Sequence, residues 1–210
     1  MTTTLCIQPG HLTLDQLHTI HAGVVQLSLP ESSRAAIAAS QQVVQRAADG
    51  DAPVYGVNTG FGKLANQRIS KAQLETLQLN LIRSHSVGVG EPLAPEIMRL
   101  MMALKAASLA RGYSGVRQVV VDTLLAVHNA GLTPWVPQQG SVGASGDLAP
   151  LAHMTLALIG EGDMLVNGQR VPALQALQQA GIAPLTLVPR KVWHLSMAPK
   201  PPPRWRCTRC

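Results

Sequence analysis

The part of the sequence best suited to chemistry is a loop of small residues, Gln139 to Pro150, which reads Gln-Gly-Ser-Val-Gly-Ala-Ser-Gly-Asp-Leu-Ala-Pro. Within it, the backbone nitrogen of Gly146 can close a five-membered ring onto the carbonyl of Ala144, because glycine has no side chain to block the approach. Ser145 between them can then lose its hydroxyl as water. The product would carry a methylene group conjugated to the ring, an electrophile that no ordinary side chain supplies. Backbone N–H groups at a helix start would stabilise electron density drawn onto it.

The same glycines also allow a plainer interpretation, a loop that binds an anion. Gly140, Gly143 and Gly146 precede a predicted helix with Asp147 as its N-cap, and N–H groups in that position bind phosphate. The spacing matches neither the phosphate-binding loop of nucleotidases, nor the dinucleotide-binding pattern, nor a nucleophile elbow. A non-catalytic helical module that binds anions is therefore the alternative that these residues leave open.

Three segments resemble the aromatic amino acid ammonia-lyases. Gly140 to His153 is similar to the active-site segment of that family, in which Ala-Ser-Gly cyclises autocatalytically to 4-methylidene-imidazol-5-one (MIO). The resemblance assigns this group to Ala144, Ser145 and Gly146, with no external cofactor. Tyr55 to Gly62 matches the family loop Tyr-Gly-Ile/Val-Asn-Thr-Gly-Phe-Gly, whose tyrosine is a candidate catalytic base. Ser84-His85 matches the Ser-His pair of the histidine-specific branch, which implies that His85 contacts the substrate imidazole.

The function that this resemblance implies is the elimination of ammonia from L-histidine to give trans-urocanate, a step of histidine catabolism. Phenylalanine or tyrosine is the alternative substrate, and the Ser84-His85 pair is the main evidence against it. The resemblance also implies a helical, L-aspartase-like fold and a homotetramer for the full-length protein. Its members are more than twice as long as this chain.

The elements that must hold these segments are mostly helices, and the sequence predicts a mainly α fold with a few short strands. Thr13 with Gln16, and Ser70 with Gln73, form capping boxes that open two of the helices. Apolar spacing and end signals predict helices over 14–21, 31–48, 95–111 and 172–180. Three further helices are predicted without fixed bounds: one that opens at Ser70 with Leu74, Leu77 and Leu81 on one face, one that ends before Gly131 with Val116, Val119, Val120, Leu124 and Val127 on one face, and one that follows Asp147. In the helix after Asp147, the side chains expected to face inward are Leu148, Leu151, Leu158 and Ile159. Strands are predicted at 53–57 and in a hairpin over 164–171, where Asn167-Gly168 is the turn.

The charge distribution argues against a nucleic-acid partner. The chain has 210 residues and a net charge of +6, but six of its 17 Lys and Arg residues lie after Pro189, in a segment without Asp or Glu. Residues 1–189 therefore carry 11 basic and 11 acidic side chains. No apolar run approaches the 18 residues of a membrane span, so we expect a cytoplasmic chain without a membrane partner. Cys207 and Cys210 have the spacing of half a zinc site, but no second pair exists, so we expect neither a metal nor a disulfide framework.

The last segment, 190–210, departs from the family pattern. After Pro189 the family continues Lys-Glu-Gly-Leu-Ala-Leu-Ile/Leu-Asn-Gly-Thr-Gln, whereas this chain reads Arg-Lys-Val-Trp-His-Leu-Ser-Met-Ala-Pro-Lys. A reading frame that starts at the last base of the Lys191 codon, with permitted wobble choices, encodes Gly-Leu-Ala-Leu-Ile-Asn-Gly-Thr-Gln. We therefore expect residues 1–189 to be an N-terminal, MIO-bearing portion and residues 190–210 to be a disordered, out-of-frame tail. Because the family's asparagine and other substrate contacts follow this point, we expect the chain to be inactive alone.

Overall fold

The protein is described by a computed structural model that covers residues 4–23, 25–54, 56–59, 69, 71–143 and 146–187. In these ranges the helices are α1 (Leu14–Ala22), α2 (Glu31–Asp49), α3 (Lys71–His85), α4 (Pro95–Ala110), α5 (Gln118–Asn129), α6 (Ala149–Leu158) and α7 (Ala173–Gln179). The strands are short: β1 (Thr4–Cys6), β2 (Gln26–Ser28), β3 (Val89–Pro92), β4 (Thr133–Pro134), β5 (Pro137–Gln139), β6 (Val142–Gly143), β7 (Gly146–Asp147), β8 (Asp163–Val166) and β9 (Gln169–Pro172). The fold is mainly α, as predicted.

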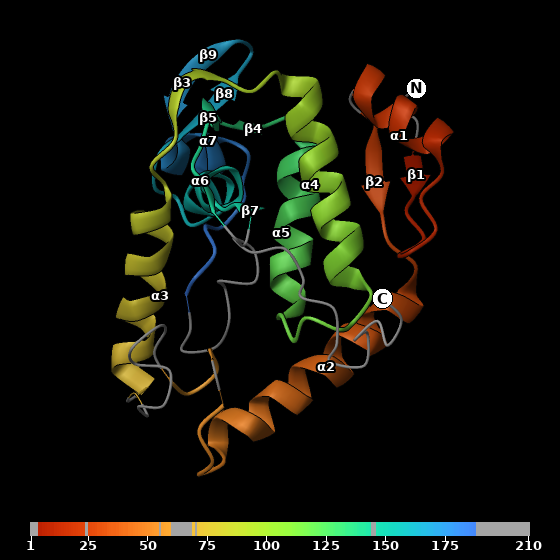
Figure 1. The fold of residues 1–210 in the computed structure, drawn as a ribbon. Coiled ribbons are helices and arrows are strands. Elements are labelled where there is room, and N and C mark those ends of the chain that lie inside the picture. Colours follow the sequence, from red (N-terminus) through yellow and green to blue (C-terminus); the bar gives the residue numbers. More distant parts are fainter. Residues whose placement is uncertain are drawn as a thin grey trace, which may run out of the picture.

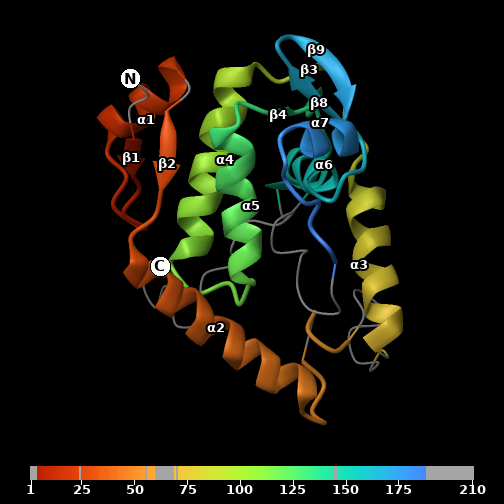
Figure 2. The same ribbon diagram turned by 180° about the vertical axis from the view of Figure 1, so that it is seen from behind.

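Helices α4 and α5 pack side by side at the centre of the molecule (Figure 1). The parallel pair β1–β2 and helix α1 lie on one side of them, while α6, α7 and the β4-β8-β9 sheet lie on the other. Helix α3 flanks α6 at the outer edge, and α2 crosses one end of the α4–α5 pair, which is also visible from behind in Figure 2. This arrangement brings the end of α3 next to the start of α6.

The main core lies between α4, α5 and α6. Its fully buried members include Met98 and Met102 of α4, Val120 and Leu124 of α5, and Leu158 of α6. Val119, which the apolar spacing placed on the same face as Val120, is exposed. A smaller cluster joins β1, β2 and α1 to α4. Burying side chains of this size stabilises the fold by roughly 1.5–3 kcal/mol each, so α6 is anchored along its length.

Local sequence signals predicted most of the helix ends and one turn. Thr13 Oγ1 accepts the N–H of Gln16 at 3.3 Å, and Gln16 Oε1 accepts the N–H of Thr13 at 3.0 Å, so the first capping box is confirmed. Ser70 of the second box lies outside the described residues. The predicted hairpin is formed by β8 and β9, and Asn167 and Gly168 both have the positive φ angles, 51° and 78°, of a type I′ turn.

The predicted strand at 53–57 is wrong. The N–H groups of Val57 and Asn58 both donate to the carbonyl of Val54, at 2.9 and 3.2 Å, which makes a tight turn. The side chain of Asn58 explains this, since its Oδ1 accepts the N–H of Val54 at 2.7 Å and its Nδ2 donates to the carbonyl of Ala52 at 2.9 Å. Asparagine thus offers the backbone local partners in place of a neighbouring strand.

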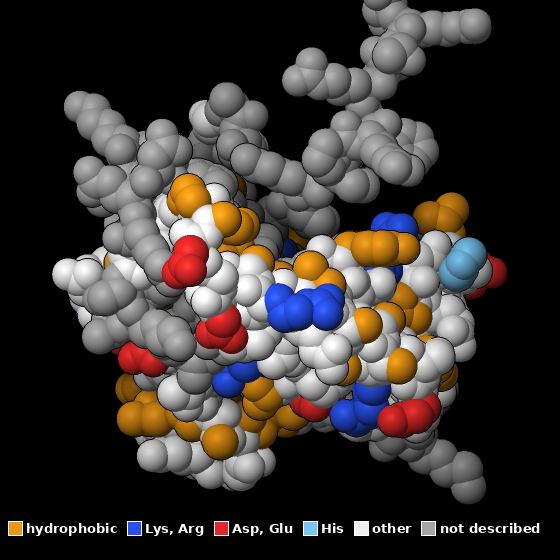
Figure 3. Space-filling view, turned by 90° about the horizontal axis from the view of Figure 1, so that it is seen from below, with side chains coloured by type: hydrophobic (Ala, Val, Ile, Leu, Met, Phe, Trp, Pro, Cys, Tyr) orange, Lys and Arg blue, Asp and Glu red, His pale blue; other side chains and the backbone are white. Residues whose placement is uncertain are grey.

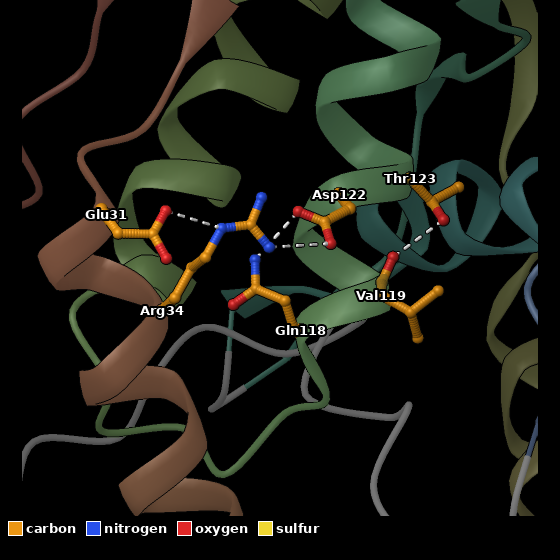
Figure 4. A network of polar contacts seen from close by, with 6 residues as sticks. All are labelled: Glu31, Arg34, Gln118, Val119, Asp122 and Thr123. Carbon is orange, nitrogen blue, oxygen red and sulfur yellow. Dashed lines mark hydrogen bonds and ion pairs between the residues drawn. The ribbon is translucent and has the colours of Figure 1, made fainter.

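Helix α2 is joined to α5 by polar contacts at the surface (Figure 4). Arg34 lies 3.3 Å from Glu31 on its own helix and 3.8 Å from the carboxylate of Asp122 on α5. Gln118 Nε2 donates to Asp122 Oδ1 at 2.9 Å, which orients that carboxylate. Because these groups are largely exposed, they contribute little to stability and serve to fix where α2 crosses α5.

Charge is mixed on the face that Figure 3 shows, where acidic and basic side chains are interspersed without a patch of one sign. This agrees with the neutral balance of residues 1–189. In the described part of the chain, none of the helices is long and apolar enough to cross a lipid bilayer.

A buried lysine makes the stability of this fold depend on pH. Lys105 of α4 is 6% exposed, and burial lowers the pKa of its ammonium group to about 8. The unfolded chain, with the ordinary lysine pKa, binds more protons between pH 8 and 10, so the free energy of unfolding rises with pH there. The free energy of unfolding of the parent, relative to that of Lys105→Met, should rise by about 2 kcal/mol between pH 7 and pH 10 when it is measured by urea titration. The exposed neighbour change Leu104→Met should show no such trend, and a constant parent–Lys105→Met difference would contradict the prediction.

Candidate functional site

The loop that carries the predicted reactive residues is a tight hairpin. Strands β6 and β7 pair Val142 with Asp147 and Gly143 with Gly146. Ala144 and Ser145, which join the two strands, lie outside the described residues. Gly146 has a φ of 85°, a left-handed conformation that glycine adopts without strain. The pairing therefore brings residues 143 and 146 opposite each other.

Asp147 closes the base of this hairpin. Its Oδ1 accepts the N–H of Ala149 at 3.0 Å and the N–H of Ser141 at 3.3 Å, so one carboxylate oxygen joins the start of α6 to the start of the loop. The prediction that Asp147 is the N-cap is wrong by one residue, because Leu148 holds that position. Asp147 still satisfies the first N–H of the helix, and its negative charge lies where the helix dipole favours it.

Gly140 makes room for that carboxylate. A Cβ atom built on Gly140 would lie 2.1 Å from Asp147 Oδ2, which is far inside any van der Waals contact. Gly143 is different, since a Cβ atom there would meet nothing within 4 Å. The requirement for glycine at position 140 is therefore steric, and it concerns the loop base.

His85 ends α3 and has one ring nitrogen already engaged. Its Nδ1 lies 2.7 Å from the carbonyl oxygen of Leu81, which can only accept, so the proton is assigned to Nδ1. Ser84 Oγ donates to the same carbonyl at 3.0 Å. In the neutral ring this leaves Nε2 with a free lone pair, which can accept a hydrogen bond from a ligand N–H group.

His85 and the hairpin line one cavity of about 360 Å³. Its walls come from the end of α3 and from the loop through the first turn of α6: Ser84, His85, Val87, Ser141, Gly143, Gly146, Leu148 and Ala149. Of the predicted site residues, the structure brings His85 and Gly146 together here. Leu148 was predicted to face the core, and this is wrong because it lines the cavity. In contrast Leu158 is fully buried, and Leu151 and Ile159 pack partly buried against the core.

Tyr55, the predicted base, lies outside the described residues, but the turn around it is held firmly. Val57 is buried, and so are Asn58 and Thr59. Gly56 donates its N–H to Thr59 Oγ1 at 3.3 Å, and Asn58 binds Val54 and Ala52 as described above. The role of Asn58 was missed from sequence, although a polar residue in a glycine-rich turn is a typical signal for such side-chain-to-backbone bonds.

The residues present fit an electrophile made from the chain's own backbone. Residues 143 and 146 are paired, Gly146 has a positive φ and open space at its Cβ position, and α6 begins three residues later. In the described ranges no group of three or more His, Cys, Asp or Glu side chains is placed to hold a metal ion.

Comparison with known proteins places this arrangement in context. The family model "Aromatic amino acid lyase" matches residues 12–195. The chain is 54% identical over 187 residues to a histidine ammonia-lyase of Rhodospirillum rubrum and 53% identical over 183 residues to one of Burkholderia pseudomallei, covering 89% and 87% of this chain. It spans only 36% of the length of each of these relatives.

Solved structures of related enzymes have the same fold. Histidine ammonia-lyase from Trypanosoma cruzi superimposes with a TM-score of 0.80 at 38% identity, over 89% of this chain and 36% of that one. Tyrosine aminomutase from Streptomyces globisporus superimposes with a TM-score of 0.83 at 34% identity, over 94% of this chain and 36% of that one. The backbone therefore resembles enzymes that act on different amino acids, and it does not by itself select a substrate.

Proposed function

Because this chain belongs to the aromatic amino acid lyase family, we propose that it is the N-terminal portion of a histidine ammonia-lyase, which converts L-histidine to trans-urocanate and ammonia. The observation that carries the proposal is the cavity that His85 lines together with the hairpin that contains Gly146. The identities of 54% and 53% to two histidine ammonia-lyases support histidine as the substrate.

The proposed reaction removes the amine, which is a poor leaving group, together with a weakly acidic β-hydrogen. Such an elimination needs an electron sink and a positioned base. MIO, formed from Ala144, Ser145 and Gly146, supplies the electron sink. In our proposal His85 accepts the imidazole N–H of the substrate through Nε2, and Tyr55, as its phenolate, removes the β-proton.

The sequence after Pro189 bears on the activity of the chain itself. We propose that residues 190–210 are translated out of frame, and that the 210-residue chain alone is inactive because the family's remaining substrate contacts are missing. Resequencing the DNA tests this directly: an extra or missing base near the Lys191 codon is expected. A clean, repeated read that encodes the present tail would contradict it. For the frame-restored product we propose a homotetramer.

The substrate is tested by assaying the frame-restored product with L-histidine, L-tyrosine and L-phenylalanine supplied separately. Formation of urocanate from histidine, followed by its ultraviolet absorbance, is the expected result. Preferential formation of coumarate or cinnamate would instead support the tyrosine or phenylalanine alternative. Specific phosphate binding by a chain of unshifted mass would support a non-catalytic, anion-binding module.

Replacing His85 with leucine should weaken the recognition of histidine. The change removes the Nε2 acceptor, and one lost hydrogen bond to a bound polar group costs roughly 1–3 kcal/mol. In the frame-restored product we expect kcat/KM for L-histidine to fall about 10- to 100-fold. Val87→Ala, which changes an apolar wall of the same cavity, is the matched control and should have a smaller effect. Equal losses in the two variants would contradict the role of His85.

A further inference from the structure

A second histidine lies close to the candidate site. His153 is on α6, one turn beyond the Ala149 that lines the His85 cavity. Its Nε2 accepts a hydrogen bond from the backbone N–H of Gly88, with the two nitrogen atoms 3.0 Å apart. Gly88 is three residues beyond His85, between the end of α3 and the start of β3. The bond therefore connects the first turns of α6 to the segment that carries His85.

Gly88 is packed closely enough that only glycine fits without adjustment. A Cβ atom on it would lie 3.2 Å from Nε2 of His153, 3.2 Å from Cβ of Pro137 and 3.3 Å from the carbonyl oxygen of Gln139. On the side of β5, Val89 pairs with Gln139. The turn after α3 is thus held by β5 on one side and by the His153 ring on the other. Of these two supports, only His153 belongs to the helix that the reactive loop leads into.

A second link between the same two helices is weaker. Glu161 lies just beyond the end of α6. Arg83 of α3 donates hydrogen bonds to its carboxylate from Nε at 2.8 Å and from Nη2 at 2.5 Å. These side chains are 51% and 36% exposed, so solvent and salt screen the pair. Figure 1 shows α3 beside α6. The half-buried Gly88–His153 bond is the contact that can set this spacing closely.

We propose that His153 is a positioning residue, which accepts the Gly88 N–H and thereby fixes the distance between His85 and the hairpin that contains Gly146. Its effect on catalysis rests on the proposed function, whereas the contact itself does not. A misplacement of about 1 Å between a binding group and a reacting group can cost up to about 100-fold in rate. His153 therefore controls how well His85 holds a substrate against the loop.

The contact requires a neutral ring. Burial lowers the pKa of His153 below its ordinary value of 6.5, so the ring is neutral at pH 7 with its proton on Nδ1. A protonated ring would place an N–H group against the N–H of Gly88, and the bond would be lost. The charged groups that face His153 are Asp163 and Arg170, which line the same cavity of about 310 Å³ and pair at 2.6 Å. His85 and the Arg83–Glu161 pair lie on the α3 side. Acidification below pH 6.5 should therefore weaken the contact.

Two substitutions of His153 and one control test this. His153→Phe keeps an aromatic ring at this position but removes the Nε2 hydrogen-bond acceptor. His153→Gln keeps a hydrogen-bond acceptor that does not titrate. His128→Phe changes another buried histidine, on α5, that lines neither cavity. In the 210-residue chain, amide hydrogen exchange at Gly88 is measured by NMR between pH 5.5 and 8. In the frame-restored product, KM and kcat for L-histidine are measured over the same range.

The expected result is that His153→Phe exchanges the Gly88 amide about tenfold faster and raises KM about tenfold at pH 8. His153→Gln should restore both values and keep them as the pH falls through the range in which the parent loses them, and His128→Phe should leave KM unchanged. Parent-like exchange and KM in His153→Phe would overturn the proposal. Should that variant not fold, a His153→Gln variant with the same acid loss as the parent would overturn it. An inactive product with normal Gly88 protection would contradict the proposed function alone.

Discussion

Replacing Ser145 with alanine should leave the chain at the mass calculated from its sequence, whereas the parent should be lighter by two water molecules. One water is lost when the nitrogen of Gly146 adds to the carbonyl carbon of Ala144 and the carbonyl oxygen departs with the amide protons of Gly146 and Ser145, which leaves a C=N bond in the ring. The second is the serine hydroxyl, which leaves with the proton on its Cα. Intact-mass spectrometry of the folded chain measures both losses without requiring activity.

Ser141→Ala is the matched control for this change. Ser141 lies in the same loop and is exposed, but it binds Asp147 through its backbone N–H, which alanine retains. The Ser141→Ala chain should therefore show the full loss of two waters. A parent chain of unshifted mass, folded as judged by its circular dichroism, would contradict the formation of MIO by this chain. In the frame-restored product, Ser145→Ala should reduce urocanate formation by several orders of magnitude, because the electron sink is missing.

The features that sequence predicted well are those whose causes lie within a few residues. The Thr13–Gln16 capping box, the Asn167-Gly168 turn and the end of α5 before Gly131 each depend on local backbone geometry. Helix periodicity likewise placed α2, α4 and α5 within a few residues, because an apolar stripe needs only the helical repeat. The identity of the reactive loop followed from a run of residue types, and its chemistry from the resemblance that this run carries.

What sequence could not supply were contacts between segments distant in the chain. His85 and Gly146 are 61 positions apart, and only the packing of α3 against α6 brings them to one cavity. The bond between Gly88 and His153 has the same origin. The strand predicted at 53–57 is wrong for the opposite reason: the side chain of Asn58, a local partner, binds the backbone N–H of Val54 in place of a neighbouring strand. Leu148 fits an apolar helix face, yet it lies at the helix start, where it lines the cavity.

Gly140→Ala should prevent most of the cyclisation even though residue 140 takes no part in the chemistry. The added Cβ would lie 2.1 Å from Oδ2 and 2.3 Å from Oδ1 of Asp147, so the carboxylate must move away. It then loses its bonds to the N–H groups of Ser141 and Ala149, at a cost of roughly 1–3 kcal/mol. With its base open, the pairing of β6 with β7 no longer constrains the backbone of Gly146. Because ring closure within a chain depends on such confinement, we expect the rate of water loss to fall at least about tenfold.

Gly143→Ala separates this explanation from a general intolerance of the loop to side chains. Residue 143 is as close to the reacting tripeptide as any, but a Cβ atom there meets nothing within 4 Å, and its φ is not in the left-handed region. The Gly143→Ala chain should therefore lose both waters at close to the parent rate, followed by mass spectrometry during refolding. The rate of water loss in Asp147→Asn should lie between the rates of Gly140→Ala and Gly143→Ala. The amide oxygen can still accept the same N–H groups, but it lacks the charge that the helix start favours. If Gly140→Ala and Gly143→Ala cyclise equally fast, Asp147 does not hold the loop for ring closure, and the confinement must come from the β6–β7 pairing alone.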